Sequence, residues 1–306
     1  MKNPVSTDGS TSSPGCSASC VAVVLAAALI LTSCGALRRD VTIWATRPLI
    51  FSSMDALMSE TDLELAKTAM EANLKLLDGL LEVDPDNREL LTLAAQGYTG
   101  YALMFVEDEN PARAGALYQR AKNLGLRALA QRGRAFLKGD FNARQLAGLT
   151  KRLKEEDIPA AYWTAAAWSS SISLDRTSPA SVAELPRALG LMQWVYDREP
   201  AFFHSAPRWF FGAYYASVSP MFGGDVDKSK EYFQEALKAE GDNFLLGKVM
   251  MARSVAVQTL DRELYVKLLE ETLTGAPDEP PDLRLMNRVA QIKARAALLK
   301  VDDVFD

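Results

Sequence analysis

The stretch FGAYYASVSPMFGGDVDKSKEYFQEALKAEGDN, residues 211–243, has the pattern of two helices joined by a short turn. Its second half repeats apolar side chains at helical spacing: Tyr232, Phe233, Ala236 and Leu237. Gly223-Gly224 supplies the turn, and Asp225 is a residue type that caps helix N-termini because its carboxylate accepts free backbone N–H groups. The stretch therefore predicts a helical hairpin.

Helical spacing continues along the rest of the chain. One apolar face runs at intervals of three and four residues: Leu63, Ala66, Met70, Leu74, Leu77 and Leu81. No segment shows the sustained alternation of a strand, so we predict an all-α fold. Turns near Pro85, Pro200 and Pro277 loosely repeat the turn at Gly241. This favours a TPR-like helical-pair superhelix (an α-α superhelix) of about eleven or twelve helices, with a concave surface.

The N-terminus carries an apolar run, Val21 to Leu31, that is too short to span a membrane and has the length of a signal-peptide core. Leu31-Thr32-Ser33-Cys34 follows it and resembles the lipobox of bacterial lipoproteins, which implies lipidation of Cys34. The alternative is an ordinary secretory signal with a cysteine nearby by chance. We expect a signal peptide over 1–33, an anchor and linker over 34–58 and a helical domain over 59–306.

Basic residues gather between Pro111 and Lys154, where eleven lysines and arginines accompany one acid, Asp140. Such asymmetry is typical of a surface that meets an anionic partner. We favour the alternative, in which these are solvated helix faces whose charge is balanced by acidic neighbours in space. The candidate docking residues are Arg127, Arg132, Arg134 and Lys138.

Few residue patterns point to chemistry. The chain has one histidine, His204, so a catalytic triad or a two-histidine metal site has little to build on. No P-loop, His-Glu-x-x-His or Gly-x-Ser-x-Gly motif is present. Glu155-Glu156-Asp157 is interpreted as an acidic first turn of a helix. We therefore predict no enzyme activity, no cofactor, no metal site and no nucleic-acid partner.

Aromatic residues are concentrated between 160 and 222, with two more beside Gly97 and Gly100, a pair that predicts a close helix crossing. Large aromatics at helical spacing are usually core residues, but some can line a groove or pore that takes an apolar ligand or a partner's anchor side chains. The candidate lining residues are Tyr98, Tyr101, Trp163, Trp168, Trp209, Phe210, Tyr214 and Tyr215.

Two blocks carry a family resemblance: DPDNRELLTLAAQGYTGYALMFVEDENPARAGALYQRAKNLGLRAL (84–129) and FFGAYYASVSPMFGGDVDKSKEYFQEAL (210–237). They resemble the T component of TRAP (tripartite ATP-independent periplasmic) transporters. The resemblance implies a periplasmic TPR-like lipoprotein, a homotrimer with a pore, association with the solute-binding subunit, and a small hydrophobic or organic-acid ligand. It supplies no catalytic residues, and only Cys34 is carried over, as the anchor.

Two functions are compatible with these features. The first is a binding and assembly module of a solute-uptake system that docks a periplasmic solute-binding protein. The second is a TPR lipoprotein scaffold that helps to assemble cell-envelope complexes and has no soluble binding-protein partner.

Overall fold

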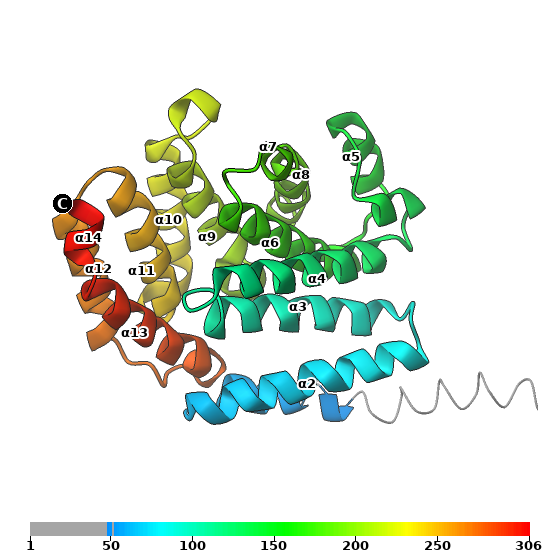
Figure 1. Ribbon diagram of the computed structural model, residues 1–306, viewed down its shortest axis with the longest axis horizontal. Helices are drawn as coiled ribbons and strands as arrows, with labels where there is room; N and C mark the ends of the chain where they lie inside the picture. Colours follow the sequence, from blue (N-terminus) through cyan, green and yellow to red (C-terminus); the bar gives the residue numbers. More distant parts are fainter. Residues whose placement is uncertain (1–47, 51) are drawn as a thin grey trace, which may run out of the picture. The chain divides into compact units, whose positions relative to one another are not determined.

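A computed structural model describes residues 48–50 and 52–306 of the 306-residue chain, so the predicted signal peptide and Cys34 lie outside the described residues. All regular elements of the described residues are helical (Figure 1), which confirms the all-α prediction. A helical segment over residues 52–58 precedes α2. The α-helices are α2 (Leu63–Val83), α3 (Arg88–Phe105), α4 (Pro111–Leu129), α5 (Ala143–Thr150), α6 (Ile158–Leu174), α7 (Pro179–Val182), α8 (Leu185–Tyr196), α9 (Phe202–Ser217), α10 (Val226–Glu240), α11 (Leu245–Met251), α12 (Arg262–Thr274), α13 (Arg284–Leu298) and α14 (Val301–Phe305).

Short turns of other helix types connect these elements. They are η1 (Arg134–Lys138), η2 (Glu155–Asp157), η3 (Pro220–Phe222), η4 (Gly241–Asn243), the π-helical η5 (Ala252–Ala256) and η6 (Pro281–Leu283). The structure has thirteen numbered α-helices between residues 52 and 306, against the expected eleven or twelve, and two of them, α7 and α14, have only four and five residues. The TPR-like register of the pairs stays a prediction.

Side-chain caps fix where several helices begin. Asp62, Asn87 and Asn110 each accept a hydrogen bond from a backbone N–H of the first turn that follows them. Such bonds satisfy amides that have no partner inside the helix. The predicted hairpin is confirmed as α9, η3 and α10: Asp225 accepts from Lys228 N at 3.1 Å, and Gly223 takes the left-handed φ of 95° that its turn requires.

The start of α9 departs from helical geometry. Phe203, His204 and Ser205 have φ values of 44°, 56° and 56°, a left-handed conformation that costs free energy for residues with a β-carbon. Hydrogen bonds hold this turn, because Trp209 Nε1 donates to the His204 carbonyl at 2.9 Å and Ser205 Oγ donates to Glu240 Oε1 at 2.6 Å. The sequence pattern gave no sign of it.

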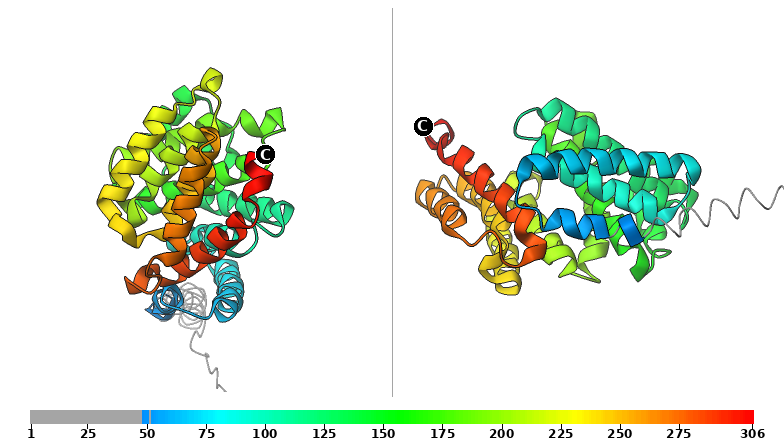
Figure 2. Two further views of the ribbon diagram at one scale, coloured as in Figure 1. Left: turned by 90° about the vertical axis from the view of Figure 1, so that its left-hand side faces the viewer. Right: turned by 90° about the horizontal axis from the view of Figure 1, so that it is seen from below.

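Helices that follow one another along the chain pack side by side, in the order α2, α3, α4, α6, α8, α9 and α10, and then α11, α12 and α13 (Figures 1 and 2). The predicted close crossing lies between α2 and α3, where a β-carbon added to Gly97 would stand 2.9 Å from Leu74 Cδ2. The last long helix, α13, also contacts α2. The two ends of the helix array between residues 52 and 306 are therefore joined.

A charged cluster strengthens this junction. Asp108, in the turn after α3, accepts hydrogen bonds from Lys293 Nζ of α13 at 2.6 Å and from Arg253 Nη1 of η5 at 2.9 Å. Burial by itself would raise the pKa of Asp108, but the charge of Lys293 and the hydrogen bonds from Lys293 and Arg253 outweigh it and lower this pKa. The stabilisation is therefore present above the ordinary aspartate pKa of about 4 and is lost as the pH falls through the lowered value.

Replacing Asp108 by alanine is expected to lower the free energy of unfolding by about 2 kcal/mol, because it leaves the buried Lys293 ammonium without a carboxylate. The estimate is below that for a fully buried pair because Asp108 is 40% exposed. Urea unfolding at pH 7 measures it. The control is Asp302→Ala, which removes an exposed ion pair with Arg262 and should cost less than about 0.5 kcal/mol. Equal losses in the two variants would contradict a joining role for Asp108.

Candidate functional site

The single histidine is packed rather than poised for chemistry. The His204 ring stacks on Phe244 with 6.0 Å between centroids, and its two nitrogens lie 3.9 Å from Glu240 and 3.8 Å from Asp282. Among residues 48–50 and 52–306, no group of three or more histidine, cysteine or acidic side chains could hold a metal ion. No helix in that same part of the chain is long and apolar enough to cross a membrane.

Five of the eight candidate lining aromatics are buried between helices. Trp168 packs edge-on against Phe141, and Trp209 packs against Phe233 and Phe244. The other three are held similarly: Trp163 against Tyr162 and Phe203, Tyr98 through its hydroxyl on Asp78, and Tyr101 through its hydroxyl on Glu71. These five residues come from α3, α6 and α9. A pore or groove role for them stays a prediction.

The remaining three candidates, Phe210, Tyr214 and Tyr215, are half-buried on α9. The structure adds two tyrosines that the candidate set missed, Tyr196 at the end of α8 and Tyr232 on α10. Helical spacing placed Tyr232 inside a helix pair, but only the packing of three helices shows that it reaches Tyr215 and Tyr196.

We call the four tyrosines Tyr196, Tyr214, Tyr215 and Tyr232 the tyrosine surface. The Tyr215 and Tyr232 rings stack at 5.7 Å and 11°, and Tyr196 meets Tyr232 edge-on at 5.4 Å. Tyr214 lies 5.1 Å from Tyr215. Burial raises the pKa of Tyr232 to about 12, so its hydroxyl stays protonated at neutral pH. This surface offers rigid apolar rings with polar tips, a combination that is enriched at protein interfaces.

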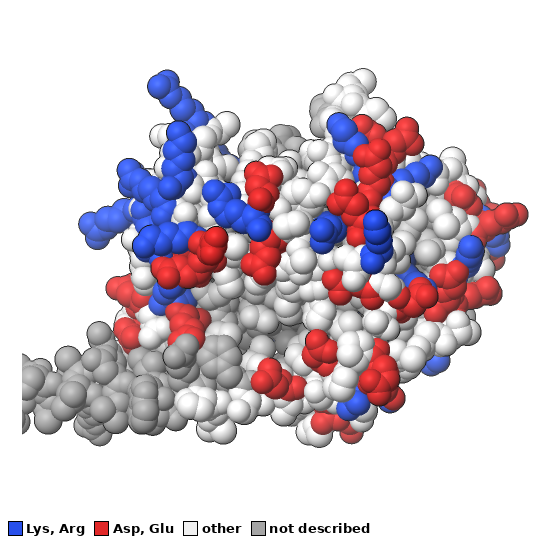
Figure 3. All heavy atoms as spheres, turned by 180° about the vertical axis from the view of Figure 1, so that it is seen from behind, with Lys and Arg blue, Asp and Glu red and all other residues white. Residues whose placement is uncertain are grey.

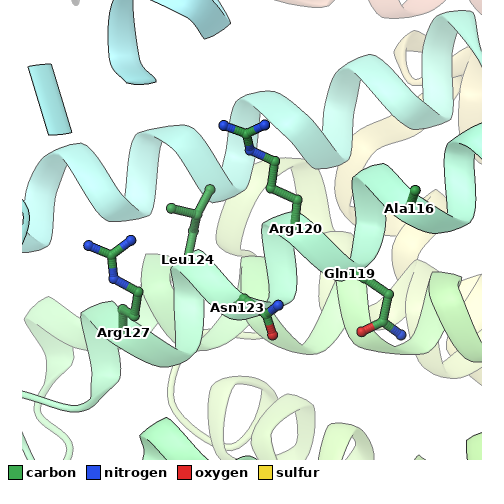
Figure 4. A pocket seen from close by; sticks show the side chains of 6 residues that line it. All are labelled: Ala116, Gln119, Arg120, Asn123, Leu124 and Arg127. Atoms are coloured by element: carbon green, nitrogen blue, oxygen red, sulfur yellow. The ribbon is translucent and has the colours of Figure 1, made fainter. Parts of the chain in front are cut away.

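A shallow hollow of about 600 Å³ lies along α4 (Figure 4). Its lining consists of Ala116, Gln119, Arg120, Asn123, Leu124 and Arg127. Both arginines are already engaged: Arg120 pairs with Asp78 at 2.7 Å and lies over the Tyr98 ring, and Arg127 donates to the Pro85 carbonyl at 2.5 Å. None of the candidate lining aromatics borders this hollow, so it does not answer the prediction of an aromatic groove.

The four candidate docking cations fall into two groups. Arg127 and Arg132 are committed inside the fold, because Arg132 Nε donates to the buried Asp157 at 2.7 Å and its guanidinium also contacts Glu156. Arg134 and Lys138 are exposed on η1, and no carboxylate of the described residues pairs with them. Arg127 donates to a backbone carbonyl and has no carboxylate partner among the described residues, so its charge, like those of Arg134 and Lys138, is not neutralised by a carboxylate. The docking role of these residues stays a prediction.

The whole basic segment divides in the same way. Arg113, Arg120, Lys122 and Arg132 lie within ion-pair distance of carboxylates, as expected for balanced helix faces. The second half differs, since its exposed cations have no carboxylate partner among the described residues. We call these six the α5 basic surface: Arg134, Lys138, Arg144, Lys151, Arg152 and Lys154. Figure 3 shows blue side chains gathered over α5 and η1, at its upper left, whereas red and blue are mixed elsewhere on that face.

Comparison with known protein families places most of the chain in one family. The model of a family described as TRAP transporter T-component matches residues 59–305, which is most of the chain and nearly all of the helix array. That family is a transporter component and not a family of enzymes. No curated protein matches the chain.

Proposed function

Since the chain belongs to the TRAP transporter T-component family, we propose that it is a lipid-anchored periplasmic component of a TRAP-type uptake system. In this proposal Cys34 carries the lipid, and the helix array binds the solute-binding subunit of the transporter. The family resemblance also motivates a homotrimer and the passage of a small hydrophobic or organic-acid ligand through a pore.

The observation that carries the docking part of the proposal is the tyrosine surface. Four half-buried tyrosines lie together on three regular helices, α8, α9 and α10, where neighbouring rings hold each of them in place. Tyrosine contributes a large contact area and loses little side-chain entropy on binding, so it is prominent among the residues that dominate interface energies. We therefore assign the docking contact to this surface.

Sedimentation velocity of the protein, alone and mixed with the solute-binding protein from the same source, tests this function. We expect a discrete oligomer that shifts on mixing. Tyr214→Ser should weaken the complex about tenfold or more, because it removes one ring of the docking surface. The matched control is Leu299→Ser, which removes an 84% exposed apolar side chain at the end of α13 and should leave the complex unchanged.

Two results would contradict the proposal. If no complex with the solute-binding protein forms at any concentration tested, the envelope scaffold would be the favoured function. A complex that forms but is equally affected by Tyr214→Ser and Leu299→Ser would keep the transport role and remove the tyrosine surface from it.

A further inference from the structure

We propose that the α5 basic surface binds the anionic headgroups of a phospholipid bilayer, which gives the protein a membrane contact of its own besides any lipid anchor. This goes beyond docking to the solute-binding subunit, which we assigned to the tyrosine surface on other helices. The inference rests on three features of residues 134–154: unpaired charge, lack of an apolar interface core, and the way the cations are spread.

The charge of this surface is not neutralised within the fold. All six cations are exposed, and they stand on η1, on α5 and in the turn that follows α5. The one acid inside the stretch, Asp140, is bound by Arg187 at 2.8 Å. After the stretch, Glu156 and Asp157 form ion pairs with Arg88 and Arg132. Glu155 follows Lys154 at the border of the stretch. The positive potential is therefore directed to solvent.

The composition of the surface fits a lipid better than a protein. Protein interfaces have a core enriched in aromatic and apolar residues and depleted of charge, with lysine disfavoured. Here the large apolar side chain that is exposed within residues 134–154 is Leu137, at 53%, between Arg134 and Lys138. Cations around one exposed leucine are typical of a surface that lies against anionic headgroups while an apolar side chain enters the interface.

The spread of the cations also argues against a site for one small anion. They come from η1, α5 and the turn after α5, and none of their side chains has a hydrogen-bond partner among the described residues, in contrast to Arg88 and Arg132, which both donate to Asp157. A bilayer needs no such convergence, because its surface charge acts on every cation within about 10 Å. Each cation near an anionic surface is expected to raise the affinity about fivefold.

Vesicle sedimentation of the full chain tests the proposal. The probes are vesicles of phosphatidylcholine alone and vesicles of phosphatidylcholine with phosphatidylglycerol. The readout is the ratio of the two partition coefficients, since insertion of an acyl chain or apolar segment contributes similarly to both. We expect a preference for the anionic vesicles of about tenfold or more at low salt, and a clear decrease at high salt.

The variant Arg134→Glu/Lys138→Glu/Lys151→Glu/Arg152→Glu should abolish this preference. Among the described residues these four side chains form no ion pair, so the variant should keep its helical circular dichroism. The matched control makes the same charge change at exposed cations elsewhere for which the described part of the chain also offers no carboxylate partner: Lys230→Glu/Lys238→Glu/Arg295→Glu/Lys300→Glu. It should keep most of the preference.

Three results would overturn the proposal. The protein could bind neutral and anionic vesicles equally, or the two fourfold variants could lose the preference to the same extent, which would indicate net charge alone. The α5 variant could also keep its vesicle preference and lose only its binding to the solute-binding protein, which would make the α5 basic surface a protein docking face. Because the vesicle assay contains no partner protein, its failure is distinguishable from failure of the proposed transport role.

Discussion

Replacing Asp157 by alanine is expected to lower the free energy of unfolding by about 3 kcal/mol, one of the two largest effects of a single substitution in this fold. The Asp157 side chain is fully buried and accepts hydrogen bonds from Arg88 Nη1 at 2.6 Å, Arg132 Nε at 2.7 Å and Lys154 N at 2.9 Å. It thereby connects the start of α3, the segment after α4 and the turn that leads into α6.

The size of this effect follows from what the substitution leaves behind. Two guanidinium groups lose a carboxylate that lies inside the protein, and a backbone N–H loses its acceptor. Both arginines keep partial access to water, which holds the loss at the lower end for a broken buried ion pair. Urea unfolding followed by circular dichroism measures it.

The neighbouring acid provides the control. Glu156 contacts the same two arginines but is exposed, so Glu156→Ala should cost less than about 1 kcal/mol. If Glu156→Ala cost as much as Asp157→Ala, the burial of Asp157 would not be the source of the stability. The Asp157→Ala variant should also loosen the base of the α5 basic surface, since Lys154 loses its backbone hydrogen bond.

The acidic triplet shows where sequence reasoning stopped. Helical periodicity and cap residues predicted the all-α fold and the hairpin at Asp225, because both depend on neighbours a few residues apart. The interpretation of Glu155-Glu156-Asp157 as a helix first turn was correct locally, since η2 leads directly into α6. Arg88, which donates a hydrogen bond to Asp157, is 69 residues away in the sequence, and nothing in the spacing of charges shows that contact.

The same limit applies to the candidate site. Eleven basic residues are alike in the sequence, yet tertiary contacts place Arg120, Lys122 and Arg132 beside carboxylates. The six cations of the α5 basic surface have no carboxylate partner among the described residues. Tyr214 and Trp209 are both aromatic residues of one helix, and the sequence does not distinguish them. In the structure Tyr214 belongs to the tyrosine surface, whereas Trp209 packs against Phe233 and Phe244. Whether an aromatic side chain is core or surface depends on which helix covers it, and that is fixed by distant segments.

The second large loss of stability is expected when Trp168 is replaced. This substitution also tests whether one of the candidate lining aromatics is a core residue or lines a pore. Its side chain is fully buried, and its ring packs edge-on against Phe141, 6.0 Å away, which packs in turn against Phe136 of η1. Its indole Nε1 donates to Glu184 Oε2 at 2.5 Å. Trp168 therefore packs α6 against the segment that contains Phe136 and Phe141, next to the α5 basic surface.

If Trp168 is a core residue, Trp168→Ala should lower the free energy of unfolding by about 4 kcal/mol, since it opens a cavity the size of an indole and removes the hydrogen bond from the indole to Glu184. Trp168→Phe keeps most of the packing and should lose about half as much. Tyr214→Ala, on a half-buried ring, is the control and should cost about 1 kcal/mol. A lining role makes the opposite prediction: Trp168→Ala would keep nearly full stability in urea unfolding and would change only ligand passage, because a side chain that faces an open pore contributes little packing.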